Sequence, residues 1–426
     1  MSVLHGPNRR ELIGAAVASA TAGAALAERR LPPGSAAPDD TRYWAAIAAQ
    51  FDRPAGVVQL ENGNWGAMAR PVLAAYQRKT AMVNGATSFY SRRSFAADFA
   101  RLRARAAGML GVSPDEIVFT RGATEALQTL IGGYNRLRPG DGLLYADLDY
   151  DSMQAAFRTV AARNQARLVT IALPEPATHQ GLIDAYTQAL EANPHVRLML
   201  LTHVSHRTGL VLPVREIVAM ARTRNVDVIV DSAHAWGQLD FALPDLDADF
   251  VGLTCQKWIG APMGVGIAYV RRNRLDAISR NMSEDAPDPD TLTRRVHTGT
   301  ANFAAFLAVE DAFNYHQAIG AKAKEARLRY LRDRWAEPLR RHGGIDILTP
   351  SDPRLTCALT SFRLAGRTTV ADNRAIAARM LEQHRIFVVD REGPARGACV
   401  RVTPAIFTSE DDIDRLSAAL RQMSRA

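Results

Sequence analysis

The chain has 426 residues and 47% of them are hydrophobic, so it is long enough to bury a large core and to form more than one domain. Its formal net charge of +8 comes from Arg and Lys residues that are dispersed along the sequence, which argues against a nucleic-acid-binding surface. The three cysteines, Cys255, Cys357 and Cys399, have no metal-ligand spacing, and such a small odd set argues against a disulfide scaffold.

The N-terminus predicts an export signal. Arg9 and Arg10 precede a mildly apolar run of small residues that ends at Ala27, in the order typical of a Tat signal peptide with its cleavage site. The run is too short and too rich in alanine for stable membrane insertion. We therefore expect residues 1–27 to engage the Tat export machinery and to direct the protein to the periplasm; the alternative is an amphipathic helix of a cytoplasmic enzyme. Residues 28–40 are typical of a linker.

Between residues 100 and 270, short apolar runs alternate with helical patterns. The runs are apolar throughout, which is typical of strands buried on both faces of a mainly parallel sheet. Their alternation with helices predicts an α/β domain. The predicted strands are Glu116–Thr120, Gly142–Ala146, Leu168–Ala172, Leu198–Thr202, Val226–Val230, Phe250–Leu253 and Gly266–Val270.

The C-terminal part is expected to form a smaller α+β domain. A long helical pattern runs from Ala304 through Tyr330 and leads into this part. We predict an N-terminal segment over residues 41–70 that packs with the small domain, a large domain over residues 71–304, and the small domain over residues 305–426. The strand candidates of the small domain are Leu359–Leu364, Ile386–Val389 and Cys399–Val402, followed by a helix from Asp411 to Met423.

Two predicted strand ends carry the clearest chemical signal. The run Val226–Val230 ends at Asp231, with His234 three residues later, and the run Phe250–Leu253 leads to Lys257 in a turn rich in Gly and Pro. The carboxyl ends of parallel strands meet at one edge of a sheet, where ligands bind. A lysine that forms an imine and a carboxylate that keeps a pyridine nitrogen protonated are the pair that pyridoxal phosphate requires. Either residue alone would be an ordinary surface lysine or helix cap.

The context of this pair resembles the class V aminotransferase family of fold-type-I pyridoxal-phosphate enzymes over most of the chain. The resemblance implies a large α/β domain with a mainly parallel seven-stranded sheet and a smaller C-terminal α+β domain. It also implies that Lys257 holds pyridoxal 5′-phosphate as a Schiff base and that Asp231 faces the pyridine nitrogen. Gly122, Ala123 and Thr124 resemble the family's phosphate cradle, where backbone N–H groups approach an anion at a helix N-terminus.

The same resemblance implies the other cofactor contacts. Tyr150 matches the aromatic residue that stacks on the cofactor ring, and Thr254 and Gln256 flank the lysine. His206 stands where relatives carry an Asn that contacts the 3′-oxygen of the cofactor, and His234 is expected beside the same oxygen. Two imidazoles there could shift the proton affinity of the imine, because a nearby positive charge favours the ionised oxygen. Gln256 replaces a His of many relatives, which puts an acid–base role at that position in doubt.

The remaining family segments imply substrate contacts and a partner subunit. Arg401 matches an Arg whose planar fork binds the α-carboxylate of the substrate. Asn64 and Trp65 lie in an Asn/Gly-rich turn that borders the substrate, although Trp65 is equally compatible with core packing. Thr300 matches a residue that reaches the phosphate of the neighbouring subunit, which implies a homodimer, although an ordinary helix N-cap gives the same pattern.

The sequence of these motifs, especially around His206 and His234, most resembles the isopenicillin N epimerase-like branch of the family. This resemblance implies a free or peptidic amino acid as substrate. A periplasmic pyoverdine-maturation enzyme of this branch also carries a Tat signal. Epimerisation and transamination would both begin with Lys257 taking the Cα proton, so both reactions stay open. Cysteine desulfuration is disfavoured, because no cysteine lies on a glycine-rich loop ahead of Arg401. A non-catalytic exported binding protein is the alternative of another class.

Overall fold

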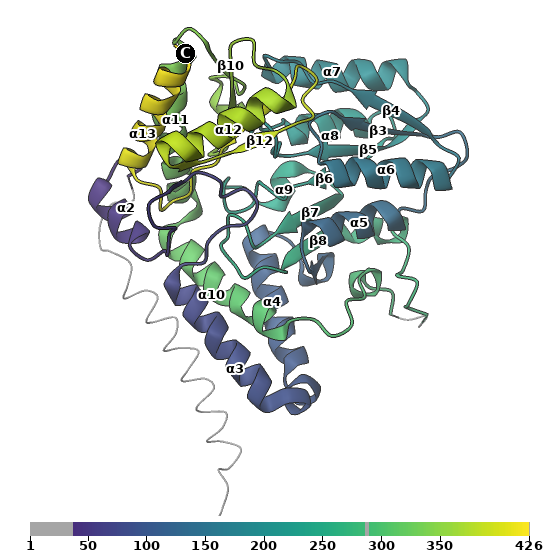
Figure 1. The fold of residues 1–426 in the computed structure, drawn as a ribbon. Helices are drawn as coiled ribbons and strands as arrows, with labels where there is room; N and C mark the ends of the chain where they lie inside the picture. Colours follow the sequence, from purple (N-terminus) through teal and green to yellow (C-terminus); the bar gives the residue numbers. More distant parts are fainter. Residues whose placement is uncertain (1–36, 286–288, 426) are drawn as a thin grey trace, which may run out of the picture.

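A seven-stranded sheet forms the centre of the larger part of the molecule (Figure 1). The computed structural model describes residues 37–285 and 289–425, so the predicted export signal lies outside the described residues. The strand order is β2-β8-β7-β6-β5-β3-β4, and every neighbouring pair is parallel except the two pairs made by β8. The strands are β2 (Ile117–Thr120), β3 (Gly142–Ala146), β4 (Arg167–Ile171), β5 (Val196–Thr202), β6 (Asp227–Asp231), β7 (Phe250–Thr254) and β8 (Gly266–Val270).

The predicted α/β fold with its mainly parallel seven-stranded sheet is confirmed, and each predicted strand lies within two residues of an observed one. Burial on both faces is wrong for β4. Among the strands of the described ranges, β4 pairs only with β3 and lies at the edge of the sheet, and Leu168 is 37% exposed.

Helices cover both faces of the sheet. Successive residues of a strand point to opposite faces, so each apolar strand has side chains to bury on both sides. In β5, Leu198 and Leu200 pack into one apolar cluster, whereas Met199 and Leu201 pack into another. Helices α5 and α6 contribute to the first cluster, and α4, α7, α8 and α10 contribute to the second. The helices of this part are α3 (Arg70–Arg93), α4 (Phe95–Leu110), α5 (Ala123–Gly133), α6 (Asp151–Arg163), α7 (His179–Ala192), α8 (Val214–Arg222), α9 (Leu243–Leu246) and α10 (Phe303–Ile319).

A four-stranded antiparallel sheet with the order β12-β13-β10-β9 forms the smaller part. It packs with helices around a separate apolar cluster that includes Trp335, Phe362 and Leu416. The elements are α11 (Ala321–Arg340), β9 (Ile345–Ile347), β10 (Thr360–Leu364), α12 (Val370–His384), β11 (Ile386–Phe387), β12 (Val389–Arg391), β13 (Cys399–Val402) and α13 (Glu410–Met423).

Two expectations for this part are wrong in detail. The single helix predicted from Ala304 through Tyr330 is two helices, because Gly320 with a φ of 91° ends α10 and precedes α11. The predicted strand Ile386–Val389 is divided between β11 and β12, which belong to different sheets. Strand β11 instead pairs in parallel with β1 (Val58–Gln59), a two-residue strand that is too short to leave a sequence signal.

The N-terminal segment connects the two parts. Helix α2 (Thr41–Ala48) places Trp44 and Ile47 in the larger core, while Val58 and Leu60 lie in the smaller one. The segment then crosses the lysine-bearing turn, where the Gly66 N–H donates to the Gln256 carbonyl at 2.8 Å. The predicted domain boundaries stay predictions.

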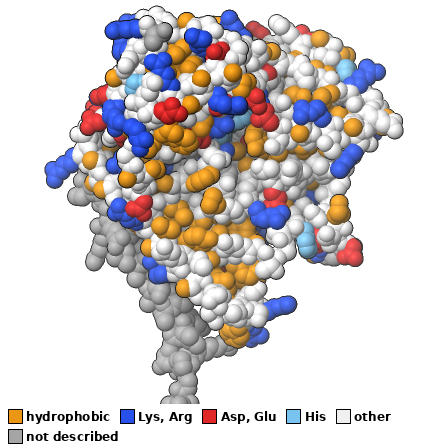
Figure 2. All heavy atoms as spheres, in the orientation of Figure 1, with side chains coloured by type: hydrophobic (Ala, Val, Ile, Leu, Met, Phe, Trp, Pro, Cys, Tyr) orange, Lys and Arg blue, Asp and Glu red, His pale blue; other side chains and the backbone are white. Residues whose placement is uncertain are grey.

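The surface gives no sign of a single-charge interface on the face drawn in Figure 2, where basic and acidic side chains are interspersed. Within the described ranges, no helix combines the length and apolar character needed to cross a membrane.

We expect Gly66→Ala to lower the melting temperature, because a Cβ at this position would overlap the Lys257 carbonyl oxygen. Overpacking of this kind costs about 1–3 kcal/mol. Gly132→Ala is the matched control, since it lies in α5 and a Cβ there would meet nothing within 4 Å. Thermal unfolding of both variants tests this, and a wild-type melting temperature for Gly66→Ala would contradict the close approach.

Candidate active site

A cavity of about 850 Å³ lies at the carboxyl edge of the seven-stranded sheet. Its floor includes Thr202, Asp231 and Thr254, which are the last residues of β5, β6 and β7. Arg391 and Arg401 line it from the four-stranded sheet. The position agrees with the general rule for open α/β sheets. The structure brings together twelve predicted site residues as cavity lining: Asn64, Gly122, Ala123, Thr124, Tyr150, His206, Asp231, His234, Thr254, Gln256, Lys257 and Arg401.

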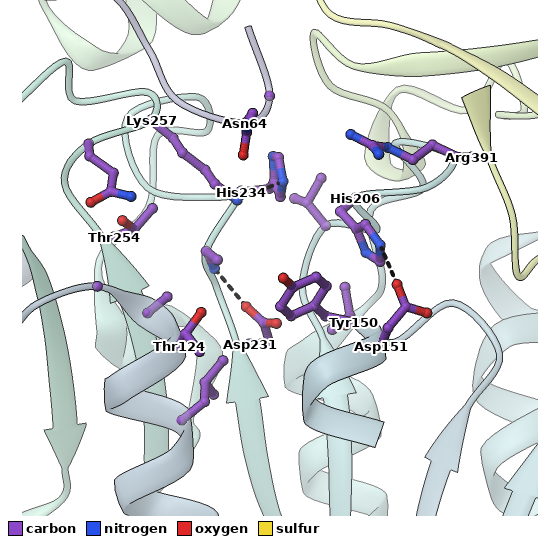
Figure 3. A pocket seen from close by; sticks show the side chains of 18 of the residues that line it. Asn64, Thr124, Tyr150, Asp151, His206, Asp231, His234, Thr254, Lys257 and Arg391 are labelled. Atoms are coloured by element: carbon purple, nitrogen blue, oxygen red, sulfur yellow. Dashed lines mark hydrogen bonds and ion pairs between the residues drawn. The ribbon is translucent and has the colours of Figure 1, made fainter. Parts of the chain in front are cut away.

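Lys257 and His234 form the centre of the site (Figure 3). The Lys257 Nζ lies 2.9 Å from Nε2 of His234. Burial lowers the pKa of Lys257 to about 8, against the opposing effect of Asp231. Burial, followed by the charges of Lys257 and Arg401, holds the pKa of His234 well below its ordinary value. The imidazole is therefore neutral at pH 7 and accepts the hydrogen bond from the lysine.

Asp231 is buried with one hydrogen bond that fixes its orientation. Its Oδ1 accepts from the backbone N–H of Ala233 at 2.9 Å. Burial raises the pKa of this carboxyl, while the backbone hydrogen bond and the charge of Lys257 lower it. Figure 3 shows the carboxyl group facing the cavity beside Tyr150. The group is thus able to hold a cationic ring nitrogen.

The N-terminus of α5 forms an open anion cradle. The first N–H groups of a helix have no intrahelical partners, and the cap residue Gly122 has no side chain that could accept from them. Gly266 of β8 permits this arrangement, because a Cβ there would lie 2.8 Å from Ala123 N. Gln256 accepts from Gly264 N at 2.8 Å through its carbonyl oxygen, so its amide group is left to donate. These groups suit a phosphate.

Tyr150 and His206 meet edge to face, with ring centroids 5.1 Å apart. Burial, then the charge of Arg401, holds the pKa of His206 well below its ordinary value. Since His234 behaves in the same way, both imidazoles are neutral at pH 7. Their predicted contacts with the 3′-oxygen of the cofactor, and the effect on the proton affinity of the imine, stay predictions.

Two predicted site residues lie outside the cavity lining. Trp65 is 53% exposed, so it is not a core residue, and its predicted contact with the substrate stays a prediction. Thr300 is also exposed. Its predicted role needs a neighbouring subunit, so the homodimer stays a prediction.

Sequence reasoning missed most of the charged residues at the site. Two of these, Glu61 and Lys324, are buried beside the cavity, and the others line it: Arg121, Glu125, Asp151, Arg374, Asp390, Arg391 and Glu392. Glu61 is buried and accepts from Arg401 Nη2 at 2.5 Å. Arg391 lines the cavity from the end of β12. Lys324 is buried and donates to the carbonyl of Trp258, next to the lysine-bearing turn, and burial lowers its pKa to about 7. Only Glu61 had a local sequence signal: it directly follows Leu60, which alternates with Val58 in the manner of a short strand.

The family described as aminotransferase class-V matches residues 67–416. The chain belongs to the class V aminotransferase family. Isopenicillin N epimerases of Amycolatopsis lactamdurans and Streptomyces clavuligerus are similar, at 28% identity over 90% of this chain and 99% of the relative, and at 29% over 85% and 94%. A probable cysteine desulfurase of Xylella fastidiosa is 25% identical over 92% of this chain and 98% of its own. The resemblance to the family and to its epimerase branch is confirmed.

Solved structures of this class share the fold. A cysteine desulfurase of Escherichia coli superposes with a TM-score of 0.74 at 21% identity, covering 89% of this chain and 98% of its own. A variant of the lyase C-DES, with glycine covalently linked to its pyridoxal-phosphate cofactor, gives a TM-score of 0.74 at 23% identity over 88% and 98%. These identities speak for the fold alone.

Pyridoxal 5′-phosphate is the cofactor of the class V family, and the residues present fit it. The α5 cradle suits its phosphate, Asp231 its ring nitrogen, and Lys257 its aldehyde. When bound, the cofactor draws electrons away from the Cα of a substrate amine. His234 Nδ1 is buried and has no hydrogen-bond partner among the described residues, which leaves a donor in the cavity wall. In the same residues, no group of His, Cys, Asp and Glu side chains could hold a metal ion.

The pKa of Lys257 predicts how cofactor attachment depends on pH. Only the neutral amine attacks an aldehyde, so the attachment rate should rise with pH and level off above about 8. An unshifted lysine would keep gaining rate to beyond pH 10. The visible absorption band of the lysine-bound cofactor measures the rate after mixing with cofactor-free protein. N-α-acetyl-lysine serves as the control for titration of the cofactor itself, and a rate that climbs in parallel with it would contradict the lowered pKa.

Proposed function

We propose that this protein acts at the Cα of an amino acid, either free or part of a larger peptidic compound, as an isopenicillin N epimerase-like enzyme. The observation that carries the proposal is the buried Lys257 amine, hydrogen-bonded to His234, with Asp231 lining the same cavity. The identity of 28–29% to two isopenicillin N epimerases supports this branch of the family.

The chain's own groups account for the proton movements. The Lys257 Nζ, with a pKa of about 8, would suit a general base near neutral pH when it is not bonded to the cofactor. His234 accepts from this Nζ and so orients it. The Nζ would take the Cα proton, and the Asp231 carboxylate would hold the ring nitrogen of the cofactor in its cationic form. Epimerisation would then need a second proton donor, such as water, on the face of Cα opposite Lys257.

Transamination is the second candidate, because it uses the same residues. It differs in the atom that receives the proton, which is a cofactor carbon instead of Cα. The family name supports this candidate, and a periplasmic aminotransferase that modifies a siderophore or another peptide side group is its specific form.

A desulfurase mechanism that relies on a protein thiol receives no support. All three cysteines lie within the described ranges, and each is buried and outside the cavity lining. Burial raises the pKa of each thiol, to about 11 for Cys399 and about 12 for Cys357. The loop between β12 and β13, which precedes Arg401, contains no cysteine.

Incubation of amino acids and peptidic amines with the protein in heavy water separates the two reactions. We expect deuterium at Cα, inversion of configuration and no keto acid. Lys257→Ala should slow the exchange by about 10²- to 10⁴-fold, the usual contribution of a general base. Keto acid and pyridoxamine phosphate in stoichiometric amounts would instead establish transamination.

Absorption spectra separate an enzyme from a non-catalytic binding protein. Wild-type protein mixed with pyridoxal phosphate should develop the visible band, and Lys257→Ala should lose it. Asp231→Asn is the matched control, since it keeps the lysine and should keep the band while it slows Cα exchange. A wild-type protein without the band would end the enzyme proposal.

We also propose export through the Tat route, on the strength of the twin arginines ahead of an apolar run. Replacing Arg9 and Arg10 by Lys should hold the protein in the cytoplasm while its visible band is unchanged. Cell fractionation and immunoblotting measure this. Wild-type protein found only in the cytoplasm would contradict the proposal.

A further inference from the structure

A second cavity adjoins the lysine-bearing turn and shares only Lys257 with the lining of the active-site cavity. Residues 257–260 of the turn form one wall. The other walls come from the N-terminal segment, from helices α3, α10 and α11, and from residues 405–407. The volume is about 40 Å³. One water molecule needs about 10–15 Å³, so the cavity has room for a single small ion.

Most of the side chains that line this second cavity are apolar. Among the described residues of the lining, none is acidic. An ion inside would therefore lose most of its water shell and would depend on the few polar groups of the wall. The apolar lining residues are Phe51, Ala67, Ala69, Val72, Ile259, Ala405, Ile406 and Phe407.

Lys324 of α11 brings a buried amine to this cavity. It is 5% exposed, and its Nζ donates to the carbonyl of Trp258. Burial lowers its pKa to about 7, and no acidic group of the described ranges opposes the shift. The nearby His316 is neutral at pH 7, because burial and the charge of Lys324 lower its pKa to about 3. A buried ammonium without a carboxylate is costly, so Lys324 either gives up its proton or has an anion beside it.

Two further hydrogen-bond donors belong to residues that line the same cavity. Tyr315 and Trp258 are each 6% exposed, and neither the hydroxyl of Tyr315 nor Nε1 of Trp258 has a hydrogen-bond partner among the residues that the structure describes. The indole Nε1 can only donate. Burial raises the pKa of the Tyr315 hydroxyl, which therefore keeps its proton at neutral pH. Together with the Lys324 amine, the wall carries three donors for a negatively charged ligand.

We propose that this second cavity binds a monovalent anion of about the size of chloride, held by the ammonium of Lys324 and by the donors of Tyr315 and Trp258. One ammonium in an apolar wall matches one negative charge. A divalent anion such as sulfate would keep an uncompensated charge there and would lose a stronger water shell. Because the lining joins the N-terminal segment to the lysine-bearing turn, the bound anion stabilises the docking of that segment. The site does not depend on which reaction the active site catalyses.

Thermal unfolding of the cofactor-loaded protein tests this site. Potassium sulfate is replaced stepwise by potassium chloride or bromide at constant ionic strength, and the loaded cofactor keeps these salts out of the α5 cradle. Sulfate stabilises folded proteins in general, so a non-specific salt effect lowers the melting temperature during this exchange. We expect the melting temperature of the wild type to rise instead, by about 1–4 °C relative to Lys324→Met, and to level off as the site fills.

Three variants separate the site from other effects of the anion. Lys324→Met removes the amine and should abolish the saturable rise. Tyr315→Phe removes one hydroxyl and should raise the half-saturating chloride concentration by about 10- to 100-fold, the usual range for a hydrogen bond to a charged group. Lys322→Met is the matched control, because Lys322 is exposed on the same helix, and it should keep the wild-type response.

A wild-type melting temperature that only falls as sulfate is replaced would overturn the proposal, as would a saturable rise that persists in Lys324→Met. A second measurement covers the case in which Lys324→Met does not fold. In crystals of the wild type grown with bromide, the anomalous signal of the ion should lie within hydrogen-bond distance of Lys324 Nζ. Water at this position, with bromide bound only elsewhere, would overturn the proposal as well.

Discussion

The desolvation of a single amine governs the site. Buried behind the edge of the sheet, Lys257 cannot keep an ordinary ammonium charge without a nearby anion, and its pKa falls to about 8. The groups around it follow from this constraint. Asp231 supplies a compensating charge, and His234 accepts the hydrogen bond only because its own burial keeps it neutral. Replacement of Lys257 by a neutral residue would change the pKa of both Asp231 and His234.

The parts of this arrangement that are encoded locally could be predicted from the sequence. Asp231 and Lys257 each follow an apolar run, and in a parallel sheet both runs had to end at the same edge. The phosphate cradle at Gly122 could be predicted in the same way, because it is a turn that joins a predicted strand to a predicted helix. Residue identities and sheet geometry were enough to bring these groups together without any knowledge of side-chain contacts.

Contacts between distant segments could not be predicted in this way. The ion pair of Glu61 and Arg401 joins residues 340 positions apart, and it depends on the docking of β1 beside β11. Strand β1 has only two residues and leaves no periodicity, so its pairing with β11 could not be predicted. The break between α10 and α11 was hidden by helical patterns on both sides of Gly320. Likewise, the neutral state of His206 follows from burial and neighbouring charge, which a sequence does not display.

The crossing of Gly66 over the lysine-bearing turn has a consequence for the timing of assembly. The segment that covers this turn emerges early from the ribosome, yet the strand that pins it, β11, begins at Ile386, close to the end of the chain. The part of this segment that pairs with β11 therefore cannot dock until Ile386 has been synthesised. The pocket around Lys257 is complete only after that point.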